Sequence, residues 1–432
     1  MRYAKGSAGR LEDSPFQQGE VKRVLTRLES VVPHLRFEPW KVSKVSASDS
    51  RHTEARWWDR ERRKVDVSIV LGSIRVMATC ERDEGAVPLE DRRVLNRLAV
   101  ESERALRAGT MGMVSLIDFG ASTVSDEIET RADLRFNFHP VLQFIRSLSH
   151  ETYENRRLSY GLIVSRTGGG AAPFHEALDN KRFKRITDGS STALVLDREG
   201  KVLELAPLHI PAHEGLAARQ RPSWSAALAE AAKEREGVGV GLSREGDLVV
   251  VDHGRLVFSQ RAGAWRAWNH NAILTRLKSL WGFPGRPGQL STVLSYLYQV
   301  AMDLSFRRSG SLLVVLGSRS HLPLVLASQA DRVESDLRTG PERALDRSLL
   351  QRSIHKTDRR IVSDLASLDG ALIVDRSGKI LAYGAMVNPA SSAKQGARTR
   401  AALGASHKGI AIKVSSDGDI ELYRGGKLHF EI

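Results

Sequence analysis

The sequence predicts an α/β (α+β) fold with a mixed central sheet flanked by helices, built as two tandem related units after an N-terminal α/β region. Three segments that each occur twice along the chain, in the same order, predict this organisation. The expected boundaries are 1–135 for an N-terminal region whose fold we do not assign, about 140–270 for the first unit and 285–432 for the second.

Two segments that contain hairpins carry the clearest internal matches. Gly237–Phe258 aligns with Gly409–Phe430 without gaps, and both read as strand, turn, strand, tight turn and strand. The glycines that the two segments share stand where a positive φ is needed. Upstream, Leu194–Leu203 matches Leu372–Leu381, and each reads as a two-strand hairpin closed by Asp-Arg-x-Gly. This order predicts one α/β unit that is repeated.

The rest of the two units matches less well. Residues 141–164 align without gaps with residues 293–316, and each segment reads as a helix, a basic turn and a buried strand. The second unit has an additional charged stretch, Asp331–Arg360, which predicts an exposed helical insertion. In the first unit the connection is instead longer around Leu208–Pro222.

The N-terminal region shows two local patterns. Val65–Glu81 is apolar enough to predict one or two buried strands. Residues 88–109 predict an amphipathic helix that begins at Pro88 and ends at Gly109.

Composition and charge limit the possible classes of function. The chain has 432 residues, of which 41% are hydrophobic and 27% charged, as in ordinary globular proteins. No apolar run approaches the roughly 20 residues that span a bilayer, so we expect a cytoplasmic protein without membrane contact. The single cysteine, Cys80, excludes an intrachain disulfide and a Cys-rich zinc site. The net charge of +14 suits an anionic partner, either a nucleotide or nucleic acid, and charge alone does not choose between them.

The first candidate site element is Asp369-Gly370-Ala371, directly before a predicted strand. A glycine at a strand entrance lets the backbone approach a ligand closely, and the aspartate can bind a divalent ion. Taken alone, an Asp-Gly pair is also an ordinary turn.

The second element follows about 25 residues later, where Gly396 precedes a predicted helix and Arg398 and Arg400 flank Thr399. A helix start offers unpaired N–H groups and a positive dipole end, and arginine forks fit phosphate oxygens. Together these features predict a polyphosphate cradle. The alternative interpretation is a solvated basic helix start.

With both elements present, the C-terminal unit resembles the diadenylate cyclase (DAC) domain, the catalytic module of the DNA-integrity scanning and membrane-bound cyclic di-AMP synthases. The family shows Asp-Gly-Ala, then Gly-Thr-Arg-His-Arg-Ala-Ala, a Gly-x-Ser-Glu step and Val-Ser-Glu-Glu. The corresponding segments here are 369–371, 396–402, 404–407 and 414–417. This chain departs from the pattern at Ala397, Thr399 and His407, where the family has threonine, histidine and glutamate.

The resemblance implies that two ATP molecules condense to cyclic di-AMP and two pyrophosphates. It assigns catalytic roles to Asp369, Arg398 and Arg400, and Mn²⁺ or Mg²⁺ as the cofactor. It further implies a homodimer or higher oligomer that pairs the C-terminal domains, because each site holds one ATP. As metal ligands we expect Asp369 and, in compensation for the lost histidine, His407. The residues expected to bind the nucleotide are Gly370, Ala371, Gly396, Ala397, Thr399, Ser406 and Ser415.

The first unit lacks these residues. The Asp-Gly-Ala positions fall on Ser191-Thr192-Ala193, and the arginine positions fall on Ser223 and Ser225. We therefore expect a degenerate DAC-like copy that senses a nucleotide or braces the second copy, with regulation through the first 280 residues. The alternative for the whole chain is a nucleotide sensor without turnover. Nucleic-acid binding rests on charge alone and is not expected.

Overall fold

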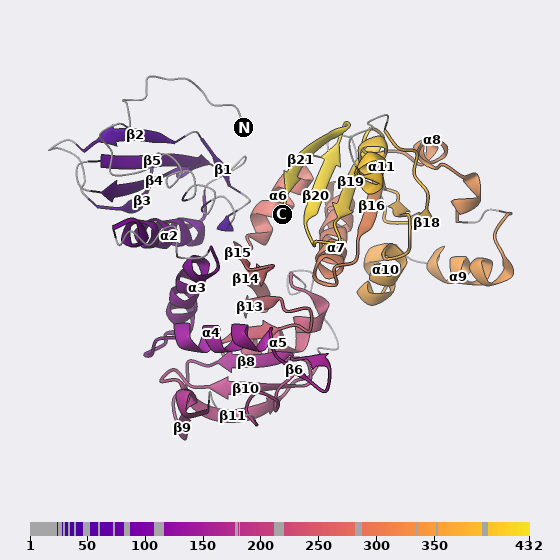
Figure 1. Cartoon of the computed structure of the whole chain (residues 1–432). Coiled ribbons are helices and arrows are strands. Elements are labelled where there is room, and N and C mark those ends of the chain that lie inside the picture. The colour runs from indigo at the N-terminus through magenta and orange to yellow at the C-terminus, as the bar shows by residue number, and fades with distance from the viewer. Residues whose placement is uncertain are drawn as a thin grey trace. The chain divides into compact units, whose positions relative to one another are not determined.

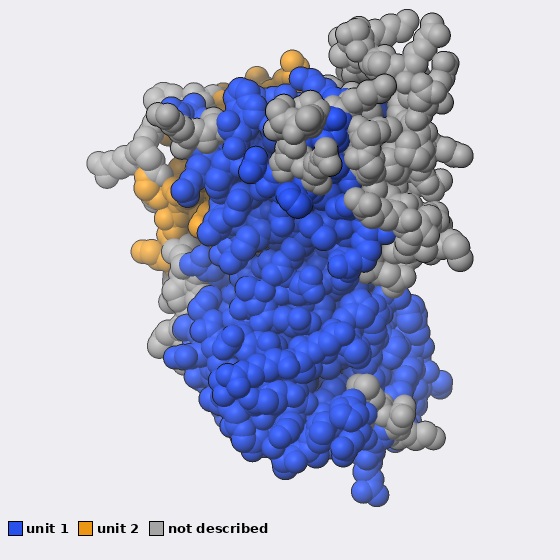
Figure 2. All heavy atoms as spheres, turned by 90° about the vertical axis from the view of Figure 1, so that its left-hand side faces the viewer, with its two compact units in different colours: residues 1–212, 224–269 blue, residues 213–223, 270–432 orange. Residues whose placement is uncertain are grey.

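The computed structural model divides into two compact units, which are treated separately below. Unit 1 comprises residues 1–212 and 224–269, and unit 2 comprises residues 213–223 and 270–432 (Figures 1 and 2). The structure describes residues 24, 28, 31–32, 35–38, 40–45, 52–58, 61–71, 74–81, 87–107, 116–177, 180, 182–210, 220–280, 287–333, 336–350, 353–390 and 396–432. Within these residues, no helix has the length and apolar character needed to cross a membrane.

Unit 1 begins with an antiparallel sheet in the order β1-β5-β4-β3, and β2 also pairs with β5. The strands are β1 (Arg36–Phe37), β2 (Lys41–Lys44), β3 (Glu54–Trp57), β4 (Lys64–Leu71) and β5 (Ile74–Glu81). Helix α2 (Leu89–Arg107) packs on β3 and β4 (Figure 1). The predicted strands at 65–81 and the predicted helix after Pro88 are confirmed, whereas the expected helix end at Gly109 lies outside the described residues.

Cys80 on β5 is fully buried in the core between this sheet and α2, and burial raises the pKa of its thiol to about 12.

The second sheet of unit 1 has the order β15-β14-β13-β12-β8-β10-β11-β9. Its strands are β8 (Tyr160–Val164), β9 (Ala172–Pro173), β10 (Thr192–Leu196), β11 (Lys201–Pro207), β12 (Val238–Leu242), β13 (Leu248–Asp252), β14 (Arg255–Arg261) and β15 (Ala264–Ala267). Because side chains alternate along a strand, β8 presents Leu162 to the core that holds α4 (His139–Leu148), and Ile163 to the core that holds α5 (Ala226–Glu234). The sheet is thus covered on both faces.

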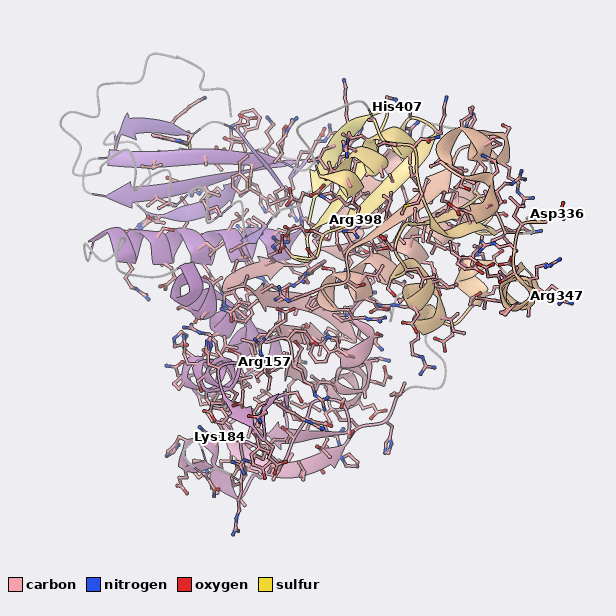
Figure 3. The ribbon with its side chains drawn as sticks, turned by 45° about the vertical axis from the view of Figure 1, so that its right-hand side comes forward. Arg157, Lys184, Asp336, Arg347, Arg398 and His407 are labelled. Atoms are coloured by element: carbon pink, nitrogen blue, oxygen red, sulfur yellow. The ribbon has the colours of Figure 1, made fainter. Side chains whose placement is uncertain are left out.

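The expected basic turn before β8 forms a small hairpin of β6 (Thr152–Tyr153) and β7 (Arg156–Arg157), whose side chains are exposed. Near it, Lys184 forms an ion pair with Glu151 at 2.7 Å (Figure 3). The acidic partner offsets part of the positive charge of this surface.

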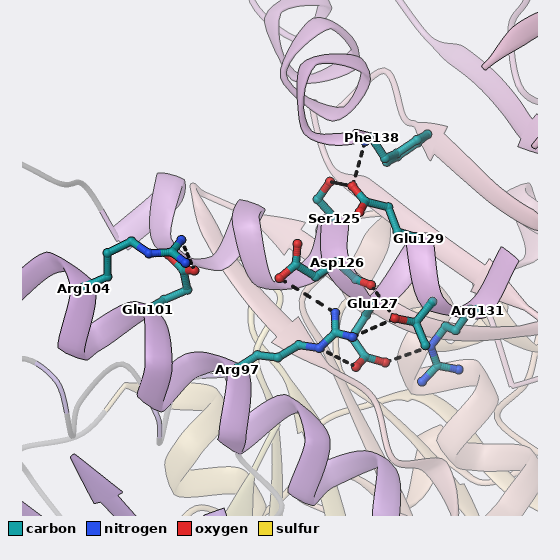
Figure 4. Close-up of polar contacts among 10 residues, drawn as sticks. Arg97, Glu101, Arg104, Ser125, Asp126, Glu127, Glu129, Arg131 and Phe138 are labelled. Atoms are coloured by element: carbon teal, nitrogen blue, oxygen red, sulfur yellow. Dashed lines mark hydrogen bonds and ion pairs between the residues drawn. The ribbon is translucent and has the colours of Figure 1, made fainter. Parts of the chain in front are cut away.

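A buried ionic network joins α2, α3 (Leu116–Ala132) and the second sheet within unit 1. Glu127 is fully buried on α3, with Arg97 Nε 3.4 Å from its Oε1 and Arg131 Nε 3.4 Å from its Oε2 (Figure 4). Arg131 also donates to Asp252 Oδ2 at 2.9 Å. An unpaired charge in an apolar core raises the free energy of the folded state. Each of these buried charged side chains therefore needs its oppositely charged partner for the fold to be stable.

Unit 2 is built on one six-stranded sheet in the order β18-β17-β16-β19-β20-β21, in which only β16 and β17 are parallel. The strands are β16 (Ser311–Leu316), β17 (Ala371–Val374), β18 (Ile380–Ala385), β19 (Gly409–Val414), β20 (Ile420–Arg424) and β21 (Lys427–Glu431). Helix α11 (Ala397–Ser406) covers one face, on which Leu312 and Val314 pack with Ala402 and Ala405. Helices α7 (Pro287–Phe306) and α10 (Arg359–Ala366) also contact the sheet: α7 contacts β16, β19 and β20, and α10 contacts β16, β17 and β18 (Figure 1). The mixed sheets confirm the predicted fold class.

The two larger sheets share one strand order around their parallel pair. In unit 1, Val164 pairs with Leu196 and Val238, and in unit 2, Val315 pairs with Val374 and Ile410. The sequence alignment of the hairpin segments equates Leu196 with Val374 and Val238 with Ile410. The strand pairings in the two sheets therefore agree with that alignment. The ungapped match of the helix–strand segments is wrong by one residue, because it equates Val164 with Leu316 instead of Val315.

The predicted insertion at 331–360 is helical but only partly exposed, which corrects the expectation. Helix α9 (Gly340–Leu350) carries Asp346, which is 2% exposed and accepts a hydrogen bond of 2.8 Å from Tyr383 on β18. The buried Arg338 guanidinium lies over the Tyr383 ring, 4.6 Å from its centroid, and 3.7 Å from the Asp346 carboxylate. These contacts anchor the insertion to the edge strand of the sheet.

Candidate functional site

The site elements gather at one edge of the unit 2 sheet. Strands β16 and β17 run parallel with Leu312 paired to Ala371, so Gly310 and Asp369 lie at the same level, just before the two strands begin at this edge. Strand β19 runs in the opposite direction and ends with Val414 opposite Ser311. Ser415 therefore follows β19 at the same edge.

Gly370 brings two backbone segments into close approach. Its φ is +112°, and a Cβ atom at this position would lie 2.5 Å from the Gly384 carbonyl carbon and 2.6 Å from the Ala385 nitrogen. Only glycine fits this position without a shift of the backbone. Asp369, the preceding residue, is exposed, and its carboxylate has no hydrogen-bond or ion-pair partner among the described residues.

Replacing Gly370 with alanine is expected to destabilise unit 2 by about 2 kcal/mol or more, because the new Cβ overlaps backbone atoms and the positive φ is strained. Thermal unfolding followed by circular dichroism would measure the loss. Gly340→Ala is the matched control, since no atom lies within 4 Å of its Cβ position. Equal melting temperatures for the two variants would contradict the close approach at Gly370.

Helix α11 begins at this edge without a side-chain cap. Its N-cap residue is Gly396, with φ −59° and ψ 155°, and the first helical residue is Ala397. The first intrahelical bond runs from Arg400 N–H to the Gly396 carbonyl at 3.0 Å. The earlier N–H groups of the first turn are thus left to other acceptors, and the positive end of the helix dipole favours an anion there.

The two arginines of the first turn have no anionic partner within the described part of the chain. The Arg398 guanidinium covers Gly310, because a Cβ atom on that glycine would lie 2.4 Å from Arg398 Nη1. Arg398 therefore lies at the start of β16, next to the strand that Asp369 precedes (Figure 3). Arg400 Nε is buried and makes no hydrogen bond. The structure thus places Arg398 and Asp369 at neighbouring strand starts, and among the described residues neither Arg398 nor Arg400 has an anionic partner.

Another predicted residue, Ser415, has protein partners within its own turn. The Ser415 hydroxyl accepts from Asp417 N–H at 3.2 Å, and Ser415 N–H donates to the Asp419 carbonyl at 2.8 Å. Ser415 therefore closes the β19–β20 turn beside the site.

Ser406 and His407 lie at the opposite end of α11, which corrects their assignment to the site. Ten helical residues span roughly 15 Å, and Figure 3 shows Arg398 and His407 at the two ends. Ser406 Oγ accepts from Gly426 N–H at 3.0 Å, and the His407 ring packs on Gly426. The structure therefore does not bring His407 to Asp369 as a second metal ligand.

The residues present suit a divalent metal that is bound mainly through the nucleotide. No group of three His, Cys, Asp or Glu side chains that could hold an ion occurs in the described ranges. Mg²⁺ is commonly held by one or two carboxylates together with substrate phosphates. The Asp369 carboxylate, which has no partner among the described residues, fits that arrangement, and those residues supply no complete metal cage around it.

Sequence reasoning missed the polar residues behind α11. Lys413 and Glu421 face each other across the β19–β20 hairpin, and Lys413 Nζ donates to Glu421 Oε1 at 2.8 Å. The turn signal Asp417-Gly418 fixes this register, so the pair could have been found from the sequence.

Comparison with known proteins finds a family match that lies within unit 2. Residues 302–428 match the family described as DAC, DisA bacterial checkpoint controller nucleotide-binding. A hypothetical membrane-spanning protein from Bacillus cereus has 17% identity over 38% of this chain and 75% of its own, with a TM-score of 0.25. A double mutant of DacA from Staphylococcus aureus has 22% identity over 34% of this chain and 90% of its own, with a TM-score of 0.22. No curated protein matches the chain. Residues 302–428 therefore form a DAC domain, of the family named for the nucleotide-binding domain of the DisA checkpoint controller.

Proposed function

We propose that unit 2 is a diadenylate cyclase that condenses two ATP molecules into cyclic di-AMP and two pyrophosphates. The observation that carries the proposal is the placement of Arg398 and Asp369 at neighbouring strand starts of one sheet, with Arg400 in the same helical turn as Arg398; none of the three has a charged partner in the described part of the protein. Two free guanidiniums at an uncapped helix start suit a triphosphate. The match of residues 302–428 to a nucleotide-binding family supports the same ligand.

The proposed chemistry divides the work among these side chains. The 3′-hydroxyl of one nucleotide attacks the α-phosphorus of the other, and the bond to the β-phosphate oxygen breaks to release pyrophosphate. Asp369 receives the hydroxyl proton, while Arg398 and Arg400 neutralise the charge that builds on the leaving group. A bound Mn²⁺ or Mg²⁺ would supply further charge neutralisation at the phosphates. Closing the ring takes two attacks, so the proposal requires a symmetric homodimer through the C-terminal domains.

We further propose that the second sheet of unit 1 is a degenerate copy of this domain. The shared strand order and register support the relationship. The nearest aspartate, Asp188, is occupied within its own turn. Burial acts to raise its pKa, but N–H groups of Ser191, Ser190 and Thr192 outweigh it and lower the pKa of Asp188 to about 2. A carboxylate engaged in this way is not available to a nucleotide.

One observation favours the second candidate function, a nucleotide sensor without turnover. Thr399 and Ala397 stand where the family has histidine and threonine, so two polar groups of the family's motif are changed. Incubating the purified full chain with ATP and Mn²⁺ and analysing the products by mass spectrometry decides between the two candidates. Cyclic di-AMP is the expected product. ATP binding without product would select the sensor, and absence of binding would refute both.

Replacing Asp369 with asparagine is expected to reduce cyclic di-AMP formation by about 100-fold or more, because the group that accepts the hydroxyl proton is lost. ATP affinity measured without metal should not fall, since a negative charge beside the triphosphate has been removed. The matched control is Asp336→Asn, which removes the same charge at another exposed position (Figure 3). Undiminished product formation by Asp369→Asn would contradict the proposed role.

A further inference from the structure

We propose that the charged insertion of unit 2 positions Asp369 for the proposed reaction, because it holds the end of β18 that packs against Gly370. Four residues make the contacts, and we call them the insertion brace: Asp331, Arg338, Asp346 and Tyr383. The inference rests on the proposed function, since it concerns how the proton acceptor of that reaction is held in place.

The side chains of the insertion brace form one buried cluster. The Tyr383 hydroxyl donates to Asp346 Oδ1 at 2.8 Å, and Arg338 Nε lies 3.7 Å from Asp346 Oδ2. The Arg338 guanidinium also lies over the Tyr383 ring, and its Nη2 donates to the Asp331 carbonyl at 2.9 Å. Arg338 is 7% exposed and Asp346 2%. A displacement of this cluster would leave a buried charge without its partner, so the cluster favours one geometry.

The insertion also holds the chain on both sides of Tyr383. Val333 N–H donates to the Leu381 carbonyl at 3.0 Å, two residues before Tyr383. Met386 N–H, three residues after Tyr383, donates to Asp331 Oδ2 at 2.9 Å. The stretch from Leu381 to Met386, which contains most of β18, is therefore held at its beginning, middle and end.

This stretch contains an irregularity in its pairing with β17. Ala371 pairs with Ala385 and Ile373 pairs with Ala382, so β18 has one extra residue between these pairs, in the two-residue stretch that begins at Tyr383. An extra residue disrupts the hydrogen bonds of the ladder locally, and such bulges beside active sites re-aim neighbouring side chains. The insertion brace thus holds β18 at the place where its own ladder supports it least.

Unit 1 shows the corresponding hairpin without this arrangement. There β10 and β11 pair residue by residue from Ala193 to Val195, with no extra residue. The connection from β16 to β17 in unit 2, residues 317–370, is also twice as long as the connection from β8 to β10, residues 165–191. The insertion and the extra residue of β18 therefore occur in the same unit as Asp369, which links them to the site rather than to the strand order that both units share.

The extra residue brings β18 against the turn that carries Asp369. A Cβ atom on Gly370 would lie 2.5 Å from the Gly384 carbonyl carbon, and a Cβ atom on Gly384 would lie 3.5 Å from the Asp369 carbonyl oxygen. The Asp369 carboxylate has no partner among the described residues, so its direction depends on this backbone contact. Loosening the insertion brace should therefore displace the proposed proton acceptor and leave the arginines of α11 in place.

The first test compares Tyr383→Phe, which removes one hydroxyl of the insertion brace, with the parent full chain. The rate of cyclic di-AMP formation at saturating ATP and Mn²⁺ is expected to fall about 3- to 10-fold, the equivalent of one hydrogen bond. The Kd for ATP, measured by isothermal titration calorimetry without metal, should stay within about 2-fold of the parent, because the arginines are unchanged. In an Asp369→Asn background, Tyr383→Phe should not lower the remaining rate further, since the group that it positions is already lost.

Hydrogen–deuterium exchange followed by mass spectrometry provides a readout that needs no ATP. Peptides that cover residues 369–374 should exchange about 3- to 10-fold faster in Tyr383→Phe than in the parent, and peptides that cover α11 should be unchanged. Asp331→Ala removes the acceptor of Met386 N–H at a half-buried position and should act in the same direction. This second variant decides alone if Tyr383→Phe fails to fold.

Tyr298→Phe is the matched control for a loss of stability alone. Tyr298 is buried on α7, and its hydroxyl lies 2.8 Å from Nδ1 of His270 on α6 (His270–Ser279). This variant should change neither the rate nor the exchange of residues 369–374.

Three results would overturn the inference and leave the proposed function intact: an unchanged rate in Tyr383→Phe, a loss that recurs in full in the Asp369→Asn background, or an equal loss in Tyr298→Phe. A parent protein that forms no cyclic di-AMP would refute the proposed catalytic function instead. The exchange of residues 369–374 would then still show whether the insertion brace holds the turn.

Discussion

Replacing Arg398 with alanine is expected to lower the rate of cyclic di-AMP formation by about 100- to 1000-fold, the range seen when one stabilising donor is removed from a developing negative charge. The Kd for ATP should rise about 10-fold or more, because a charge-assisted hydrogen bond to phosphate is lost. Arg400→Ala should act in the same direction, since both guanidiniums lack a partner among the described side chains. Product formation and ATP binding are measured in parallel on the full chain.

Two further variants separate the chemistry of Arg398 from its charge. Arg398→Lys keeps the charge but loses the planar fork, so intermediate activity is expected. Arg347→Ala is the matched control, because it removes the same charge from an exposed position on α9, well apart from Arg398 in Figure 3. If Arg347→Ala were as inactive as Arg398→Ala, net charge rather than a specific phosphate contact would explain the loss.

The second large effect is expected in unit 1, where Glu127→Gln should lower the free energy of unfolding by about 3 kcal/mol. This substitution keeps the shape of the side chain but leaves Arg97 and Arg131 without the buried carboxylate between them (Figure 4). Breaking a buried ion pair costs more than the pair itself contributes, because the remaining charges stay desolvated. In a unit of this size the loss corresponds to a fall in melting temperature of roughly 10 °C.

Glu101→Gln provides the comparison for Glu127→Gln. Glu101 pairs with Arg104 at 2.7 Å on α2, where the Arg104 side chain is 72% exposed and the Glu101 side chain 18% exposed, against 0% for Glu127 (Figure 4). Exposed pairs contribute at most about 1 kcal/mol, and salt screens them. A similar fall in melting temperature for both variants would show that Glu127 behaves as an ordinary surface charge.

The parts of the fold that local signals specify could be predicted from the sequence. The hairpins at 238–261 and 409–431 follow from turn glycines, and Gly246 and Gly418 have the required φ of +87° and +97°. Asp369-Gly370 and the arginine pair could be named from the sequence because each carries its own chemistry, and their roles stay predictions. The fold of residues 1–135 was not assigned, since short strands such as β1 and β3 carry too little periodic pattern.

Contacts between residues distant in sequence explain why some features of the structure could not be predicted from local sequence patterns. That Gly310 lies under Arg398 depends on the three-dimensional path of α11 over β16, which no local pattern records. The charged insertion appeared exposed because its partner Tyr383 comes about 40 residues later and accommodates Asp346 and Arg338. His407 was assigned by its motif, whereas the length of α11 places it at the other end of the helix.

The central place of β16 has a consequence for how the chain emerges during synthesis. Its run Ser311–Leu316 is wholly buried, yet both neighbouring strands are translated later, about 60 residues on for β17 and 100 for β19. At ribosomal rates of about 5–20 residues per second, an apolar, aggregation-prone strand would wait several seconds for its partners. Late closure of such distant pairings is also the slow kind of folding step. Chaperone demand in this protein should therefore peak between the appearance of β16 and the appearance of β19.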